Sequence, residues 1–447
     1  MNDLNLLQSR VLAVFLACGI TACASYEPRP LPDWSASIGM AATESKEEFT
    51  FASAVAWLLE HNERLAVARG RWAAARALAA EPTPLANPTL GIGPVFLSGV
   101  PSVPGSEQAL EGVLGWVLPL SGLRGATDAL HEARAQAAHI DAIVVARQEY
   151  LALRGELLAL AVQIERARQM KQAHNVLQAF ADQQRALGAV GSSMDLHLAE
   201  LAAMAAGSKA AGHEALVLIS QGVVARRCGA SVDRVAGLPV RIVPKLPDQI
   251  VSTAVLITAL EQHPDLVALR ADYDVAERDL RREVRKQYPD LALDGGYERE
   301  NGTSRLALPL GFELPVFDTN QQAIAQAEAR RAALRQRYDL RVQALQQEVV
   351  LAREVLLREF ARYQALDGKL NRLVMAIRSS VDTLVDAERM SRRERAEIYR
   401  RVFEAQDAEL DARDAVLQSW NSLERACGAP LLNLPGQPSA PTEEEIK

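Results

Sequence analysis

Two long stretches of the chain carry hydrophobic residues at the spacing of an amphipathic helix. In the second stretch, apolar residues follow one another at spacings of three and four from Val342 to Leu384. Such a seam is typical of a coiled coil. Neither stretch, about 121–187 and 319–390, contains a proline, so each is predicted to form a helix on the order of 100 Å long. The first stretch has an apolar residue at every seventh position: Leu123, Leu130, Ala137, Val144, Leu151 and Leu158.

Four shorter segments alternate between apolar and other residues, which is the period of a β-strand. They predict strands at about 89–97, 111–119, 290–298 and 304–316. Alternation over about ten residues fits a transmembrane strand with lipid on one face, and it also fits a soluble hairpin packed on helices. The last segment is the most regular, with every second residue large and apolar: Leu306, Leu308, Leu310, Phe312, Leu314 and Val316.

The chain also repeats itself, at a period of roughly 200 residues. A solenoid repeat is much shorter, so the pattern predicts a duplicated half, with repeats at 50–229 and 252–430, a linker at 230–251 and a tail at 431–447. In each half, two short helices and two strands precede the long helix, a polar turn and a returning helix. The matching phrases are His61-Asn62 with His263-Pro264, Asn87-Pro88-Thr89-Leu90 with Tyr288-Pro289-Asp290-Leu291, Leu118-Pro119-Leu120 with Leu314-Pro315-Val316, and Cys228-Gly229-Ala230 with Cys427-Gly428-Ala429.

The N-terminus has the pattern of a secretory signal over residues 1–22. Arg10 precedes a ten-residue apolar core that is too short to span a bilayer. Ile20-Thr21-Ala22-Cys23 resembles a bacterial lipobox, and in such signals the peptidase cuts before the cysteine, which then carries lipid. The alternative is an ordinary signal peptide in which Cys23 has no such role. Residues 23–49 are predicted to be a lipidated tether, because they are rich in proline and polar residues.

Composition narrows the class of function. The charged fraction of 23% disfavours a polytopic helical membrane protein, and the net charge of −7 argues against nucleic acid as the main partner. No motif of an enzyme, a metal site or a cofactor site occurs, and the seven histidines are scattered. Cys228 and Cys427 occupy matching positions in the two repeats and are expected to be small buried side chains rather than a disulfide.

Four strands cannot close a barrel in a membrane, because the smallest such barrels need about eight. An open sheet edge in lipid would leave backbone groups without hydrogen bonds. If the strands span a membrane, several chains must therefore share one barrel, and three chains would supply twelve strands. The fold class predicted on this basis is mainly α with a small β part: a long α-helical coiled-coil barrel continuing a transmembrane β-barrel of four strands per protomer, shared by a trimer, with an internal two-fold repeat.

The sequence resembles the TolC family of outer-membrane efflux proteins, the outer membrane factors, over about 50–435. The resemblance rests on the two-half duplication and on four phrases. They are His263-Pro264-Asp265-Leu266, Tyr288-Pro289-Asp290-Leu291, Leu314-Pro315-Val316-Phe317-Asp318, and Leu423-Glu424-Arg425-Ala426-Cys427-Gly428-Ala429-Pro430-Leu431. Trp116 to Ala126 looks most like the heavy-metal efflux branch of this family.

The resemblance implies a homotrimer in the outer membrane of a Gram-negative bacterium, with a helical tunnel in the periplasm. It implies a passive exit duct rather than an enzyme, working with a periplasmic adaptor (membrane fusion protein) and an inner-membrane pump of the resistance-nodulation-division (RND) type. The exported substrate would be a heavy-metal cation or a drug. Two alternatives remain open: a type I protein secretion duct, and a structural coiled-coil lipoprotein of the envelope.

The resemblance also indicates where the tunnel tip would contact the adaptor or form a gate. The first tip is expected near Gly188, Gly191, Ser192, Ser193 and Asp195, since glycines permit a tight turn and Ser193 or Asp195 can cap the returning helix. A plain helix–helix turn without a contact role is the alternative. The second tip is expected near three arginines that could ring the tunnel mouth, or equally form a solvated turn: Arg392, Arg393 and Arg395.

Overall fold

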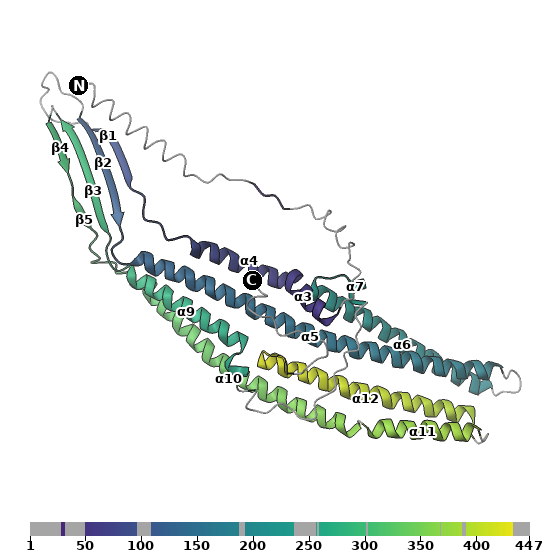
Figure 1. Cartoon of the computed structure of the whole chain (residues 1–447). Helices are drawn as coiled ribbons and strands as arrows, with labels where there is room; N and C mark the ends of the chain where they lie inside the picture. Colours follow the sequence, from purple (N-terminus) through teal and green to yellow (C-terminus); the bar gives the residue numbers. More distant parts are fainter. Residues whose placement is uncertain are drawn as a thin grey trace. The chain divides into compact units, whose positions relative to one another are not determined.

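The computed structural model describes residues 28–31, 50–95, 109–186, 193–236, 256, 259–300, 303–366, 368–386 and 390–431. Residues 48–447 form one compact unit, and its described part consists of long helices and one small antiparallel sheet (Figure 1). The prediction of a mainly α protein with a small β part is confirmed. The expected signal sequence, the lipidation site Cys23, most of the linker and almost all of the tail lie outside the described residues.

Two short helices begin the unit, α3 (Phe51–His61) and α4 (Glu63–Ala80). Thr50 caps α3 through a capping box with Ser53. Asn62 ends α3 and begins α4, and its side chain accepts a hydrogen bond of 3.0 Å from the backbone N–H of Leu65. The boundary between these helices is therefore set by one residue, whose side chain satisfies one of the free backbone N–H groups at the start of the second helix.

The first long helix is continuous, as the heptad pattern predicts. It is α5 (Leu123–Ala186), whose 64 residues span about 95 Å. The chain returns along it as α6 (Ser193–Cys228), and α7 (Val232–Ala236) follows after a turn at Gly229, whose φ is +71°. Glycine adopts this left-handed conformation without the steric cost that a Cβ brings, so it ends α6.

The second long helix differs from the prediction because it is divided. The chain forms α9 (Pro264–Arg285), α10 (Gln321–Leu366), α11 (Lys369–Asp386) and α12 (Arg392–Cys427). Gly368, between α10 and α11, has a φ of +68°, which is incompatible with a continuous right-handed helix. The apolar seam runs across this position without interruption, so hydrophobic spacing alone did not indicate the break.

The sheet has strands β1 (Thr89–Val95), β2 (Ala109–Leu118), β3 (Leu291–Glu300), β4 (Thr303–Ala307) and β5 (Leu310–Phe312). All pairs are antiparallel in the order β1-β2-β3-β4, and β5 also pairs with β3. The single strand expected over 304–316 is thus divided and ends at Phe312. Pro309 lacks the N–H that a sheet ladder requires, which accounts for the gap. Phe312 pairs with Leu291, the first residue of β3, so β5 ends where its partner strand begins.

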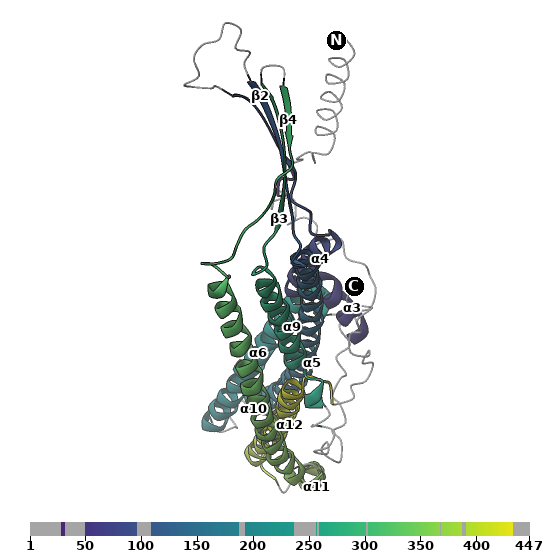
Figure 2. The same cartoon turned by 90° about the vertical axis from the view of Figure 1, so that its left-hand side faces the viewer.

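The helix α5 lies at the centre of the packing, in contact with α4, α6, α9 and α12. The helix α10 packs on α9 and α12. Near the sheet the order is therefore α4, α5, α9, α10, and farther away it is α6, α5, α12, α10. Figures 1 and 2 show the strands beyond one end of these helices.

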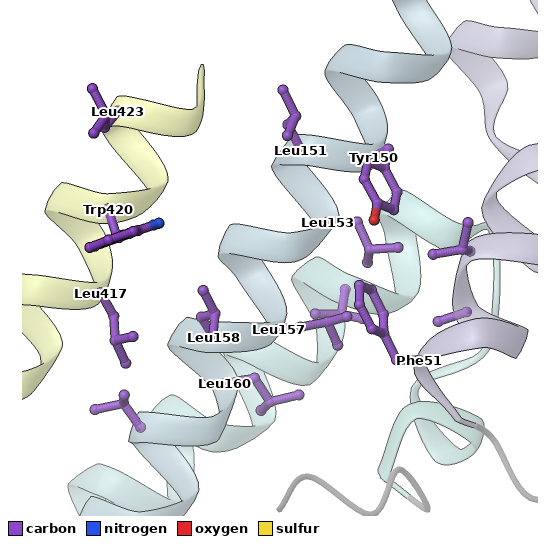
Figure 3. Close-up of a cluster of buried hydrophobic side chains, with 14 of the residues drawn as sticks. Phe51, Tyr150, Leu151, Leu153, Leu157, Leu158, Leu160, Leu417, Trp420 and Leu423 are labelled. Carbon is purple, nitrogen blue, oxygen red and sulfur yellow. The ribbon is translucent and has the colours of Figure 1, made fainter. Parts of the chain in front are cut away.

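The main core lies where α3, α5, α6 and α12 meet (Figure 3). Phe51 and Tyr150 stack with ring centroids 6.5 Å apart, and Trp420 of α12 is 1% exposed. A buried ion pair joins the two halves of the chain here: Arg154 of α5 donates bonds of 3.1 and 2.8 Å to the carboxylate of Glu424 of α12. Both side chains are almost fully buried, at 0% and 1% exposed.

Candidate functional site

The strand register divides the sheet into two chemically different faces, because directly paired residues on antiparallel strands point to the same side. Leu90 pairs with Leu114, Trp116 with Leu293, and Leu291 with Phe312. We call this side the apolar face. Its large apolar and aromatic members are Leu90, Ile92, Leu114, Trp116, Leu118, Leu291, Leu293, Tyr297, Leu306, Leu308, Leu310 and Phe312. Gly112, Gly295 and Ser304, whose hydroxyl lies 3.0 Å from that of Tyr297, share this side.

Large side chains of the apolar face are open to solvent in the single chain. Leu90 is 63% exposed, Leu306 73% and Leu310 72%. Water-soluble monomers rarely expose a contiguous apolar surface of this kind. The soluble hairpin packed on helices, one of the two alternatives left by the sequence pattern, would have covered this face.

The opposite side, which we call the charged face, carries small and charged side chains. Its members are Thr89, Gly91, Gly93, Glu111, Val113, Gly115, Val117, Ala292, Asp294, Gly296, Glu298, Arg305, Ala307 and Gly311. Gly115 is necessary where it stands, since a Cβ there would lie 2.9 Å from both Asp294 Oδ1 and Thr89 Oγ1. The carboxyl group and the hydroxyl group therefore share the space above this glycine.

A buried carboxylate fixes the end of α9 to the start of α10, just after the last strand. Glu283 accepts hydrogen bonds from Asn320 Nδ2 (3.0 Å), Lys286 Nζ (2.9 Å) and Arg282 Nη2 (2.5 Å). Burial alone would raise the pKa of Glu283, but these hydrogen bonds outweigh it and lower the pKa to about 2. Asn320 holds a φ of +57°, a conformation that asparagine tolerates better than most residues.

At the far end of the helices from the sheet, an aromatic cluster joins the two hairpins. Phe180 of α5 and Tyr399 of α12 have ring centroids 6.0 Å apart. The Arg395 guanidinium lies 5.3 Å from the Phe180 ring centre and 5.8 Å from that of Tyr399, a cation–π arrangement. Ala203 of α6 is buried in the same cluster. Three helices therefore meet at this point.

Ion pairs surround this cluster. Arg185 contacts Asp182 and Glu200, each at 2.8 Å, which connects α5 to α6. On α12, hydrogen bonds from Arg400 and Arg401 lower the pKa of Glu397 to about 2. Because these groups are exposed, each pair contributes little to stability and mainly sets the charge pattern of the surface.

The structure places only some of the residues predicted at the tips. Ser193 is the first residue of α6 and Asp195 lies in its first turn, where a negative charge interacts favourably with the helix dipole. Gly188, Gly191 and Ser192 lie outside the described residues. Asp195 also lines an open groove of about 380 Å³, together with residues of α5, α6 and α12 such as Phe180, Leu198, Leu201, Ala396 and Arg400.

The second group of predicted residues begins α12. Ser391 caps this helix in a capping box with Glu394, so the hydrogen bonds of Glu394 go to Ser391. Arg392 and Arg393 follow the cap. Arg395 packs on the rings of Phe180 and Tyr399. The sequence did not predict this contact, because Phe180 and Arg395 are far apart in the chain. Aromatic residues make up only 5% of the chain, and this rarity was the one signal in the sequence that could have drawn attention to Phe180 and Tyr399.

Cys228 and Cys427 are free and buried. Burial raises the pKa of the Cys228 thiol to about 12 and that of the Cys427 thiol to about 11, so both are neutral at ordinary pH. Within the described ranges, no group of three His, Cys, Asp or Glu side chains is arranged to hold a metal ion. No helix among the described residues is both long and apolar enough to cross a membrane.

Comparison with known proteins points to one group. Residues 255–429 match the family described as outer membrane efflux protein. No curated protein matches the chain. Among solved structures, the outer membrane protein VceC from Vibrio cholerae has a TM-score of 0.64 at 15% identity, over 85% of this chain and 96% of that one.

Two further solved structures are similar. The Neisseria gonorrhoeae MtrE outer membrane channel, in its open state, has a TM-score of 0.64 at 17% identity, over 86% of this chain and 89% of that one. The Campylobacter jejuni CmeC outer membrane channel has a TM-score of 0.66 at 14% identity, over 95% of this chain and 98% of that one. At these identities the likeness establishes the fold.

Proposed function

We propose that the chain is the outer-membrane exit duct of a tripartite efflux pump, because residues 255–429 match the family described as outer membrane efflux protein. Three copies share one β-barrel in the outer membrane of a Gram-negative bacterium, and their helices continue it as a tunnel in the periplasm. The duct conducts substrates passively and catalyses no reaction.

The observation that carries this proposal is the sheet with one exposed apolar face and one charged face. Lipid is the environment that suits the apolar face, and a water-filled lumen suits the charged face. Among the residues that the structure describes, two sheet edges have no partner strand, because β1 pairs there only with β2, while β4 and β5 pair only with β3. Pairing the β1 edge of one copy with the β4–β5 edge of the next would close the sheet and satisfy both edges.

The outermost helices support the same association. Large apolar side chains are exposed on α6, where Leu201 is 64% and Met204 72% exposed. Others are exposed on α10, where Val350 is 63% and Leu351 66% exposed. These helices lie at opposite sides of the packed layer, so in a closed ring α10 of one copy would meet α6 of its neighbour. That contact would cover both surfaces.

We further propose that each chain is a duplicated half, which gives the trimer pseudo-sixfold symmetry. Equivalent contacts support this. A Cβ on Gly229, which follows α6, would lie 2.7 Å from the carbonyl oxygen of His61. A Cβ on Gly428, which follows α12, would overlap Pro264 and lie 3.0 Å from His263 Cδ2. In each half, a left-handed glycine packs against the start of the helix that leads to the strands.

The remaining assignments follow from the resemblance and from sequence. Cys23 carries the lipid anchor, and the hairpin ends, including Asp195 and Arg395, face the periplasmic adaptor. The pump in the inner membrane is of the RND type, and the exported substrate is a heavy-metal cation or a drug. Outer-membrane lipid is the other partner.

The test is to express the full chain, purify it from the outer-membrane fraction in detergent, and measure its mass and its conductance in planar bilayers. We expect a heat-modifiable trimer with a β contribution to its circular dichroism and stable channels. A helical monomer without channels would overturn the proposal and favour a structural coiled-coil lipoprotein. Co-purification with an ABC transporter instead of an RND pump would indicate type I protein secretion.

A further inference from the structure

We propose that the cleft where the two halves of the chain meet binds a small oxyanion of the phosphate type, through His263 Nε2 and the Arg425 guanidinium. The cleft has a volume of about 270 Å³, and it is lined by α5, by the first residues of α9 and by the turn that ends α12. The inference does not depend on the proposed function, because one chain contains the whole site.

His263 places a hydrogen-bond donor in the wall of this cleft. Its side chain lines the cleft and is only 4% exposed. Its Nδ1 accepts the backbone N–H of Asp265 at 3.2 Å, so the proton of the neutral ring lies on Nε2. Among the described residues, Nε2 has no hydrogen-bond partner although it is buried. A buried N–H group without a partner costs free energy, and a bound ion is one of the few things that account for it.

The His263 ring is neutral at ordinary pH. Burial lowers its pKa from the usual 6.5 and outweighs the neighbouring groups that raise it. Among these groups are the Asp265 carboxylate and the Arg425 carbonyl, and that carbonyl already accepts the backbone N–H of Gly428 at 3.2 Å. Nε2 can therefore only donate, which selects an anion over a cation as the ligand.

Four arginines line the cleft, and three of them already have carboxylate partners. Arg64 pairs with Glu149 at 2.8 Å, and Arg227 contacts the same carboxylate. Arg341 pairs with Asp265 at 2.7 Å. Arg227 and Arg341 each have a further carboxylate partner outside the cleft, so these charges are balanced among themselves.

Arg425 is the exception among the four. It is exposed, and within the described part of the chain its guanidinium forms neither an ion pair nor a hydrogen bond. A guanidinium presents its N–H groups as a planar fork that matches two oxygen atoms of a phosphate or a carboxylate. Arg425 is therefore the one cation of the cleft that is available to a ligand.

The start of α9 favours negative charge at the same place. The backbone N–H groups of Leu266 and Val267 donate to the carbonyl of His263, at 3.0 and 3.1 Å, so they do not serve a ligand. The positive end of the helix dipole still acts on the cleft. Gly428 keeps the edge of the ring uncrowded, since a Cβ there would lie 3.0 Å from His263 Cδ2.

Size and chemistry together define the ligand. A water molecule takes up about 30 Å³, so a cleft of about 270 Å³ holds a phosphate ion together with several waters. Two direct donors, one of them charged, fit a Kd on the order of 0.1 mM for so small a ligand. Chloride offers no pair of oxygen atoms to the guanidinium fork, so it should bind much more weakly.

The experiment titrates the purified full chain in detergent with sodium phosphate by isothermal calorimetry, at a constant ionic strength of about 0.15 M. We expect one saturable site per chain, and no saturable signal with sodium chloride. Arg425→Gln and His263→Asn should each raise the Kd for phosphate at least about tenfold, the loss of one buried or charged hydrogen bond. Asparagine at 263 keeps a capping oxygen for α9, as Asn62 does for α4.

The matched control is Arg226→Gln. Arg226 stands two residues before Cys228, as Arg425 stands two residues before Cys427, and it is likewise exposed but does not line the cleft. This variant should bind phosphate as the wild type does. If it weakens binding as much as Arg425→Gln, phosphate responds only to the overall charge of the chain and the inference is wrong.

Two other results would overturn the inference: a wild type without saturable phosphate binding, or an Arg425→Gln variant with the Kd of the wild type. Arg425 is exposed, so this variant decides the matter even if His263→Asn fails to fold. Phosphate binding by a protein that forms no channels would support the inference and contradict only the proposed function.

Discussion

At the scale of single residues, the two halves of the chain are held together by a few buried groups. Arg154 and Glu424 pair in the core, and Glu424 Oε1 also accepts a 2.8 Å hydrogen bond from the backbone N–H of Leu431. Next to Arg154, Gly155 leaves room for Asn421 of α12. The close approach of α5 and α12 thus depends on a glycine as well as on the ion pair.

The ion pair gives a first prediction. Arg154→Met should destabilise the protein by about 3–5 kcal/mol, because it leaves the Glu424 carboxylate buried without its counter-ion. The double variant Arg154→Met/Glu424→Leu should recover most of that loss. Thermal unfolding followed by helical circular dichroism measures both. The exposed Arg401→Gln, which removes a 3.0 Å contact with Glu397, is the control and should leave the melting temperature nearly unchanged.

The left-handed glycines give a second prediction. Gly428→Ala and Gly368→Ala both place a Cβ on a residue whose φ is near +68°, at 67° and 68°. That conformation alone costs about 1–2 kcal/mol. Gly428→Ala should cost clearly more, because its Cβ would meet Pro264 and His263, whereas nothing lies within 4 Å of a Cβ at Gly368. Equal melting temperatures for the two variants would contradict the role given to the contact.

At the scale of elements, hydrophobic spacing predicted most of the architecture. The heptads of α5 and the alternation from Leu306 to Phe312 are local signals, so one sequence was sufficient to find them. The break at Gly368 was missed because the seam passes through it, and the gap at Pro309 because its neighbours keep the period of two. At the candidate site, the contact of Arg395 with Phe180 could not be predicted, because the two residues are far apart in the sequence and meet only in the folded chain.

The junction between α9 and α10 gives a third prediction. The pKa of Glu283 is lowered from 4.5 to about 2, so its contribution is complete above about pH 4.5 and is lost as the pH falls toward 2. This contribution is on the order of 3 kcal/mol. The melting temperature of Glu283→Gln should therefore lie below that of the wild type at pH 6, and the gap should narrow by pH 2. The exposed Glu81→Gln should show no such convergence.

At the scale of the whole molecule, the two faces of the sheet give a fourth prediction. Leu306→Arg puts a charge on the apolar face, at a cost of about 2–4 kcal/mol near the middle of a bilayer. Ala307→Arg puts the same charge on the opposite face at the neighbouring position. Only Leu306→Arg should reduce the yield of heat-modifiable trimer in outer-membrane fractions. If both variants assemble equally well, the apolar face does not meet lipid.

The unpaired edges of the sheet have a consequence for biogenesis. In the described part of the chain, each single copy carries two strand edges without a partner strand beside an exposed apolar surface. An edge strand without a partner can pair with a strand of any other chain. Correct assembly and aggregation therefore compete for the same backbone N–H and C=O groups. We therefore expect two factors to limit the yield of assembled protein more than the stability of any one helix does. They are the rate at which new copies are produced and the protection of unassembled copies by holdase chaperones.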